Sequence, residues 1–124
     1  MSTAQVAILD DDRVIIRHLA RELDREHGIE VRAFNRPRDL LADVSTLDLA
    51  NRILIDCDLG KGEMTGVDVA ERLQILGFRN LILSSGFRAS VFDESVRRLF
   101  LGFVPKLDHE TIIAVLAGQL QPSW

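Results

Sequence analysis

Short apolar runs alternate along the chain with longer stretches in which apolar residues recur every three or four positions. The first run, residues 6–9, ends in acids and is followed by Ile15, Leu19 and Leu23 at helical spacing. A short, continuous apolar run is typical of a parallel strand buried on both faces, and the second pattern indicates an amphipathic helix. The same pair of patterns occurs five times, so we predict five strand and helix units.

The predicted strands each have a short apolar centre, at residues 6–9, 29–34, 53–55, 81–83 and 103–104. The first predicted helix stops near Gly28, and the second covers about residues 37–44. The later three helices are marked by apolar residues on one face: Val69, Leu73 and Leu76; Phe92, Val96 and Leu99; Ile112, Leu116 and Leu120. This order predicts an α/β/α sandwich around a parallel sheet.

Polar and charged residues follow four of the predicted strands. They are Asp10 and Asp11 after the first, Asp56 after the third, Ser84 after the fourth and Lys106 after the fifth. Because right-handed crossovers place the carboxyl ends of parallel strands at one edge of the sheet, we expect these groups to meet there. The next residue, Asp12, is expected to cap the first helix.

The types of residue at this edge suit phosphoryl chemistry. Carboxylates from two strands repel one another, and a hard divalent cation such as Mg²⁺ relieves that repulsion. A carboxylate can also form an aspartyl phosphate, and Asp56 is the central candidate nucleophile. The Lys106 ammonium and the Ser84 hydroxyl would then bind oxygens of the phosphoryl group.

Composition limits the other possibilities. The 124 residues are 47% hydrophobic, which fits one globular domain, and the formal net charge of −4 with dispersed basic residues disfavours nucleic-acid binding. The apolar runs are too short to span a membrane, the start Met1-Ser2-Thr3 is polar, and Cys57 is the single cysteine. We therefore expect a cytoplasmic protein with no internal disulfide and no membrane partner. Trp124 is expected to be frayed.

Taken in order, these motifs resemble those of a bacterial two-component response-regulator receiver domain, over about residues 5–120. The segment VAILDDD resembles the acidic pair after the first strand of that family, and ILIDCDL resembles its phosphorylation site. LILSSG resembles the motif with the switch hydroxyl, and GFVPK the motif with the lysine.

The resemblance implies a flavodoxin-like (βα)5 sandwich with strand order 2-1-3-4-5, in a stand-alone domain covering residues 1–124. It implies Asp56 as phosphoacceptor, Mg²⁺ bound by Asp10, Asp11, Asp56 and the Asp58 backbone carbonyl, and Ser84 and Phe103 as switch residues. Gly66 would open the third helix. The implied partners are a histidine kinase or histidine phosphotransfer protein and a downstream protein target; the domain would act as an acceptor and not as a conventional enzyme.

Three features depart from the family pattern. Proline usually follows the lysine, whereas here Pro105 precedes Lys106 and Leu107 follows it. Phe103 stands where tyrosine is frequent, so a switch would work by ring packing. The loop between Asp56 and Gly66 is also a residue or two longer than in many relatives.

Two alternatives stay open. ILIDCD also fits the strand motif of haloacid-dehalogenase-type phosphatases, with Asp56 as nucleophile and Asp58 as acid/base, although those enzymes place their metal-binding acids after the lysine. The other alternative is a degenerate receiver that acts as a constitutive interaction module.

Overall fold

The computed structural model describes residues 5–124, so the polar start at residues 1–3 lies outside the described residues. The chain forms five strands, each four or five residues long: β1 Gln5–Leu9, β2 Glu30–Phe34, β3 Arg52–Asp56, β4 Leu81–Ser85 and β5 Gly102–Pro105. The α-helices follow them in turn: α1 Arg13–His27, α2 Pro37–Ala42, α3 Gly66–Ile75, α4 Glu94–Arg97 and α5 His109–Leu116. Two short 3-10 turns are η1 Val44–Thr46 and η2 Ala89–Val91.

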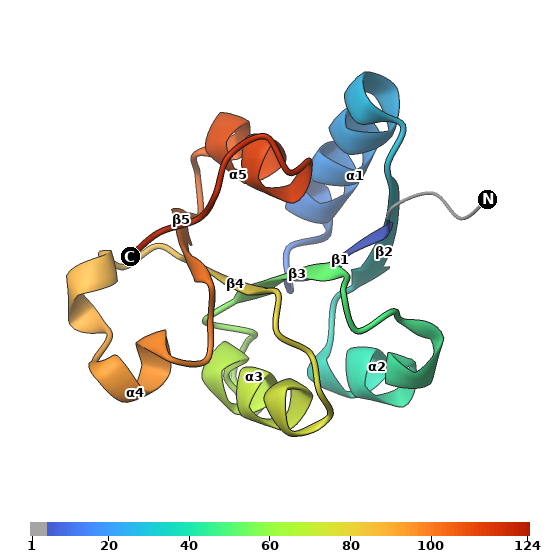
Figure 1. The fold of residues 1–124 in the computed structure, drawn as a ribbon. Coiled ribbons are helices and arrows are strands. Elements are labelled where there is room, and N and C mark those ends of the chain that lie inside the picture. Colours follow the sequence, from blue (N-terminus) through green and yellow to red (C-terminus); the bar gives the residue numbers. More distant parts are fainter. Residues whose placement is uncertain (1–4) are drawn as a thin grey trace.

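All five strands form one parallel sheet in the order β2-β1-β3-β4-β5. Helices α1 and α5 cover one face of this sheet, and α2, α3 and α4 lie on the other (Figure 1). The predicted three-layer sandwich and its strand order are therefore confirmed. Strand order reverses between β1 and β3, which is where sheets of this type form their ligand-binding crevice.

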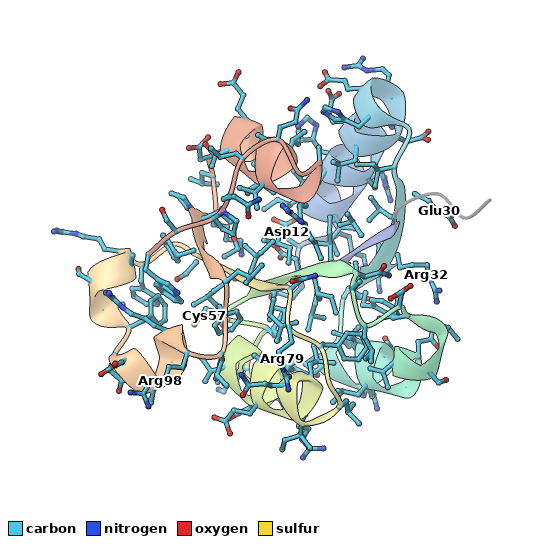
Figure 2. All side chains as sticks on the ribbon, in the orientation of Figure 1. Asp12, Glu30, Arg32, Cys57, Arg79 and Arg98 are labelled. Atoms are coloured by element: carbon cyan, nitrogen blue, oxygen red, sulfur yellow. The ribbon has the colours of Figure 1, made fainter. Side chains whose placement is uncertain are left out.

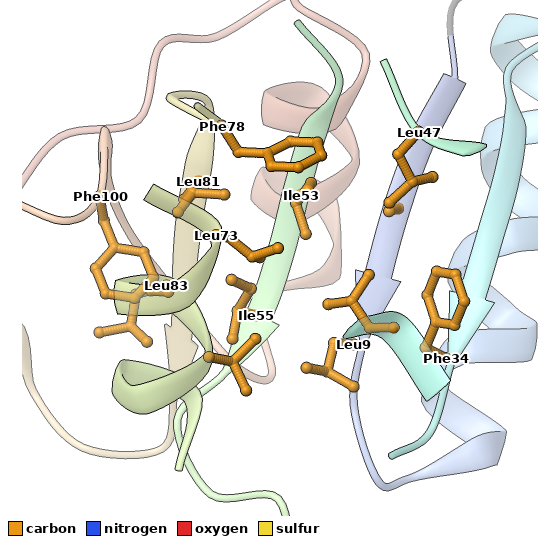
Figure 3. Packing of buried hydrophobic residues seen from close by; sticks show 14 of the residues in the cluster. Leu9, Phe34, Leu47, Ile53, Ile55, Leu73, Phe78, Leu81, Leu83 and Phe100 are labelled. Atoms are coloured by element: carbon orange, nitrogen blue, oxygen red, sulfur yellow. The ribbon is translucent and has the colours of Figure 1, made fainter. Parts of the chain in front are cut away.

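Each face of the sheet has its own hydrophobic core. Alternate residues of a strand point to opposite faces, so Ile53 and Ile55 join the α2 and α3 side while Leu54 joins the α1 and α5 side. On the first side Leu73 and Phe78 pack over the sheet (Figure 3). Burial on both faces explains why the central strands are continuous apolar runs.

The ends of α1 follow directly from the sequence. The Asp12 carboxylate accepts the backbone N–H groups of Val14 and Ile15 at 3.0 and 3.3 Å, so it caps the helix as predicted (Figure 2). At the other end Gly28 has φ 63°, in the left-handed region that glycine adopts without a steric cost. Both ends of this helix are thus set by single residues.

The predicted lengths of three helices were wrong. Helix α2 ends at Ala42, and the predicted end at Val44 lies in the η1 turn. Helix α4 has four residues, because the Asp93 carboxylate accepts the N–H of Val96 and places the start of the helix after Phe92. Helix α5 ends at Leu116, and Leu120 lies beyond it.

In residues 5–124, no helix combines the length and the apolar character that crossing a membrane requires.

Candidate functional site

Three consecutive acids leave β1 with three different environments. Asp10 is 3% exposed, and its Oδ1 accepts the backbone N–H of Asp12 at 2.8 Å. Asp11 is exposed, and Asp12 is used at the start of α1. Asp10 and Asp11 therefore remain available at the carboxyl edge of the sheet.

Asp56 ends β3 beside these two carboxylates and is 2% exposed. The Lys106 ammonium donates to Asp56 Oδ2 at 2.8 Å, and its Nζ lies 3.7 Å from Asp10 Oδ1. Lysine reaches both carboxylates although Pro105 precedes it, and no peptide bond in the described part of the chain is cis. The departure from the usual lysine-proline order therefore does not keep Lys106 away from the site.

Burial and the neighbouring groups both shift the pKa values of Asp10, Asp56 and Lys106. Burial raises the pKa of Asp10 to about 7, helped by the negative charge of Asp56 and opposed by the hydrogen bond from Asp12. Burial also raises the pKa of Asp56, against the hydrogen bond and charge of Lys106. For Lys106 burial lowers the pKa, but the hydrogen bond and the carboxylates outweigh it and raise the pKa overall. The pocket thus has more negative charge than its ammonium neutralises.

The carboxylate oxygens of Asp10, Asp11 and Asp56 are close enough to share one cation. One oxygen from each lies within 4.8 Å of the others. Carboxylate oxygen is the ligand that hard divalent cations prefer, and Mg²⁺ completes its shell with water and phosphate oxygens. These side chains fit a magnesium ion.

Ser84 lies across from Asp56, because β3 and β4 pair Asp56 with Ser84 in register. It is 2% exposed, and no hydrogen bond of its hydroxyl is found among residues 5–124. The neighbouring Ser85 hydroxyl, in contrast, accepts the backbone N–H of Phe87 at 2.9 Å. Of the two serines, Ser84 is the one whose hydroxyl remains available to a ligand.

The loop after β3 passes beside Asp11. Asp58 is exposed, and its carboxylate accepts the N–H of Gly60 at 3.1 Å, so its side chain shapes the loop. A Cβ at Gly60 would lie 3.7 Å from Asp11 Oδ2, which places this backbone beside the exposed acid. The predicted metal role of the Asp58 carbonyl stays a prediction.

Gly66 opens α3, as predicted, and its lack of a side chain is required there. A Cβ at this position would lie 2.2 Å from the Asp56 carbonyl oxygen. The Gly66 N–H donates to the Cys57 carbonyl at 2.9 Å. The Cys57 side chain is half-buried and packs against the hydrophobic core on the α2 and α3 side of the sheet (Figure 2).

Phe103 lies on β5, with its ring in an aromatic cluster that the sequence did not predict. The cluster consists of Phe92, Phe100, Phe103 and Trp124, with ring centroids about 6 Å apart. The prediction that Trp124 is frayed was wrong. Three phenylalanines spaced 3 to 11 residues apart were a signal for such a cluster, but nothing local linked them to the tryptophan.

The five-stranded sheet, its helices and the acids at its carboxyl edge define a flavodoxin-like α/β domain with a carboxylate pocket. No family model and no curated protein matches the sequence. Solved structures do match over nearly the whole chain.

A CheY-like response regulator receiver domain from Methylobacillus flagellatus has a TM-score of 0.77 and 20% identity, covering 96% of this chain and 100% of that one. A CheY-like receiver domain from Methanospirillum hungatei has a TM-score of 0.73 and 26% identity, covering 95% and 97%. The BeF3-activated DrrB receiver domain has a TM-score of 0.71 and 19% identity, covering 95% and 97%. The chain has the fold of response-regulator receiver domains, as its motifs predicted.

Proposed function

We propose that this chain is the phosphoacceptor receiver of a two-component phosphorelay, with residues 5–120 as one receiver domain and Asp56 as the acceptor. The observation that carries the proposal is the 2.8 Å hydrogen bond from Lys106 to Asp56 beside the carboxylates of Asp10 and Asp11. A buried nucleophilic carboxylate with one fixed cation and two metal-ligating neighbours suits phosphoryl transfer, which depends mainly on positioning and charge neutralisation.

In the proposed reaction a free oxygen of Asp56 forms a bond to phosphorus as the bond from phosphorus to an imidazole nitrogen of the donor breaks. The donor imidazole keeps that electron pair, and the product is an acyl phosphate. Lys106, already bound to one Asp56 oxygen, would donate to an oxygen of the transferred group. The Ser84 hydroxyl, opposite Asp56 in the sheet, would donate to another.

Asp10, Asp11, Asp56 and the Asp58 carbonyl are the residues that would hold Mg²⁺. When bound, the ion supplies positive charge for the carboxylates and for the oxygens of the phosphoryl group. The carboxylate cluster supports this assignment, since its single ammonium leaves it with excess negative charge.

The proposed output is a change in protein binding. Phosphorylation would shift an existing equilibrium between two states through Ser84 and Phe103, and the partners would be a histidine kinase or phosphotransfer protein and a downstream target. Ser84 pairs with Val104, next to Phe103, in the register of β4 and β5, which gives a short path between the two switch residues. We expect this relay in the cytoplasm.

The phosphatase alternative finds less support. It requires acids after the lysine, but the Asp108 carboxylate caps α5 by accepting the N–H of Thr111 at 3.2 Å. The carboxylates beside Asp56 come instead from the end of β1. The position of Lys106 likewise disfavours a degenerate receiver.

The test is the mass of the intact protein after incubation with Mg²⁺ and a small acyl phosphate. We expect wild type to gain one phosphoryl group, Asp56→Asn to gain none, and Asp39→Asn, an exposed acid on α2, to behave as wild type. Beryllofluoride, which activates the DrrB receiver domain, should protect wild type from this modification. An unmodified wild type, or a modified Asp56→Asn, contradicts the proposal; continuous turnover of the donor without accumulation of modified protein favours the phosphatase.

A further inference from the structure

The segment after α5 turns back and runs along the free edge of the sheet. Gly118 has φ 81°, and the N–H groups of Gln119 and Leu120 both donate to the Ala114 carbonyl. Residues 121–124 then pass β5, which is the outer strand on that side (Figure 1). We call residues 121–124 the tail.

The tail pairs with β5 as a short antiparallel strand would. The Phe103 N–H donates to the Ser123 carbonyl at 3.1 Å, and the two residues form an antiparallel bridge. The edge of a sheet presents unpaired backbone groups, and an added extended segment is the usual way to satisfy them. Here the chain supplies that segment itself.

Gly102 makes room for this contact. A Cβ at Gly102 would lie 2.5 Å from the Ser123 nitrogen and 2.6 Å from the Pro122 carbonyl carbon. Glycine inside a strand weakens it and marks a site of close approach by another backbone. Strand β5 is therefore shaped to receive an extended segment across its first residues.

Trp124 anchors the tail by packing its ring against Phe92, Phe100, Phe103 and Arg97, which we call the aromatic cage. Its ring stacks on Phe103 at 25° with centroids 6.1 Å apart, and it meets Phe92 and Phe100 edge-on at 6.0 and 6.3 Å. The Arg97 guanidinium carbon lies 5.3 Å from the centre of the tryptophan ring. Aromatic rings in this arrangement, with a cation over one face, bind a flat aromatic side chain in a defined orientation.

Trp124 makes no side-chain hydrogen bond to the residues of the cage, and other groups hold Arg97 in place. Arg97 is held by the carbonyls of Phe92 and Ala89, at 2.9 and 3.1 Å. The indole Nε1 of Trp124 is buried and makes no hydrogen bond with any residue in the range 5–124. An unpaired buried donor weakens the seating of the tail, so the tail fills the cage without an optimal fit.

We propose that the β5 edge and its aromatic cage form a binding site for an extended peptide that bears an aromatic residue, and that the tail occupies this site in the free protein. The partner would be a protein segment that pairs antiparallel with β5 and inserts its aromatic side chain in place of Trp124. The tail would then act as a built-in competitor, because an attached ligand has a high effective concentration. This inference does not depend on phosphorylation of Asp56.

The test uses a labelled synthetic peptide with the sequence of residues 119–124, carrying Trp124→Phe and an amidated end. Its binding to the full chain is followed by fluorescence anisotropy without Mg²⁺ or a phosphodonor. We expect the Trp124→Ala variant of the protein to bind the peptide at least about tenfold more tightly than wild type, because the cage is then empty. Phe87→Ala removes an exposed phenylalanine elsewhere and should leave the wild-type affinity unchanged.

Displacement can be seen directly in wild type, because Trp124 is the single tryptophan and the chain has no tyrosine. Unlabelled peptide contains neither residue, so the emission reports Trp124 alone. We expect its emission to move to longer wavelength, and its quenching by acrylamide to increase, as the peptide saturates.

Two results would overturn the proposal. One is equal or undetectable binding of the peptide by wild type and by a folded Trp124→Ala variant. The other is an unchanged Trp124 emission at peptide concentrations that saturate both proteins. If Trp124→Ala does not fold, the emission experiment on wild type decides alone. Because neither experiment includes a phosphodonor, failure here leaves the acceptor role of Asp56 untouched, and the reverse also holds.

Discussion

At the scale of single residues, Asp10 is the group whose ionisation is least compatible with its surroundings. It is buried, it lies near the Asp56 carboxylate, and it shares a lysine that is already bound to Asp56. Its pKa of about 7 means that the folded protein holds a proton that an unfolded chain releases near pH 4. The stability of the fold should therefore depend on pH in a particular direction.

We predict that the free energy of unfolding decreases as pH rises from about 4 to 7, as far as Asp10 determines it. In that range the folded state binds more protons than the unfolded state, so the slope with pH is negative. Asp10→Asn removes the ionisation but keeps an oxygen that can accept the Asp12 N–H. This variant should be more stable than wild type at pH 8 by on the order of 1 kcal/mol.

Urea unfolding at a series of pH values measures this difference. Asp39→Asn, on the surface of α2, should keep the wild-type slope. If Asp10→Asn has the same pH dependence as wild type, the charge of Asp10 is not what destabilises the pocket.

A second residue-scale prediction concerns the two lysines of the chain. Lys106→Ala should slow phosphoryl uptake at least about tenfold, because a phosphoryl oxygen and Asp56 lose their shared donor. Lys61→Ala, in the exposed loop beside the pocket, should have a small effect. Rates from intact-protein mass spectra compare the variants. A larger effect of Lys61→Ala than of Lys106→Ala would show that Lys61, in the loop, supplies the positive charge for phosphoryl uptake.

At the scale of elements, the contact between α3 and the end of β3 fixes the acceptor loop. The first residue of α3, Gly66, lies against the Asp56 carbonyl, and the Thr65 hydroxyl and the Asp68 carboxylate cap the helix reciprocally. The capping sets where the helix begins, and the glycine sets how closely it approaches the strand. Together they hold the backbone of the acceptor residue in place.

We predict that Gly66→Ala destabilises the protein by about 3 kcal/mol or more, because its Cβ would overlap backbone that cannot move without disturbing β3. Gly28→Ala is the matched control: it meets open space, and only its positive φ opposes a side chain, at about 1 kcal/mol. Chemical unfolding of both variants tests this. Equal costs would show that the Asp56 loop relaxes to admit a methyl group.

Periodicity predicted the existence of every strand and helix, but it did not predict where α4 and α5 end. Phe92 and Leu99 have helical spacing relative to Val96, yet both lie outside α4. The capping by Asp93 was visible in the sequence and outweighs the spacing, because a capped start excludes the preceding residue. For α5, Gly118 allowed the chain to turn before Leu120.

At the scale of the whole molecule, cation binding should be coupled to folding. A site that requires Asp10 and Asp11 from β1 and Asp56 from β3 exists only when the sheet is formed. Ligands that bind the folded state alone stabilise it, by about 1.4 kcal/mol when present at tenfold their dissociation constant.

We therefore predict that Mg²⁺ raises the melting temperature of wild type by several degrees, on the order of 4 °C at that saturation. Asp11→Asn should lose most of this shift, because it removes one ligand from the cluster. Thermal melts with and without chelator measure it. An equal shift in both proteins would indicate binding elsewhere.

The groups of the candidate site were predictable because each follows a strand, and parallel topology brings strand ends together. The tail was not predictable in this way. Trp124 lies 21 residues after Phe103 in the sequence and has no periodic relation to it, so their contact depends on how the chain turns after α5. Contacts set by a reversal of the chain leave no local pattern.

The three acids after β1 make this segment far more sensitive to length than to composition. Asp10 is buried in the carboxylate cluster, Asp11 lies at its exposed edge and Asp12 caps the start of α1. Only two peptide bonds separate the first of these positions from the last. Deleting any one of them leaves two carboxylates for three positions and moves Arg13, now the first residue of α1, into the capping position of Asp12, where a cation faces the positive end of the helix dipole and no carboxylate accepts the first N–H groups. A single codon lost here would disrupt both the pocket and α1, although the remaining sequence would still read as acidic.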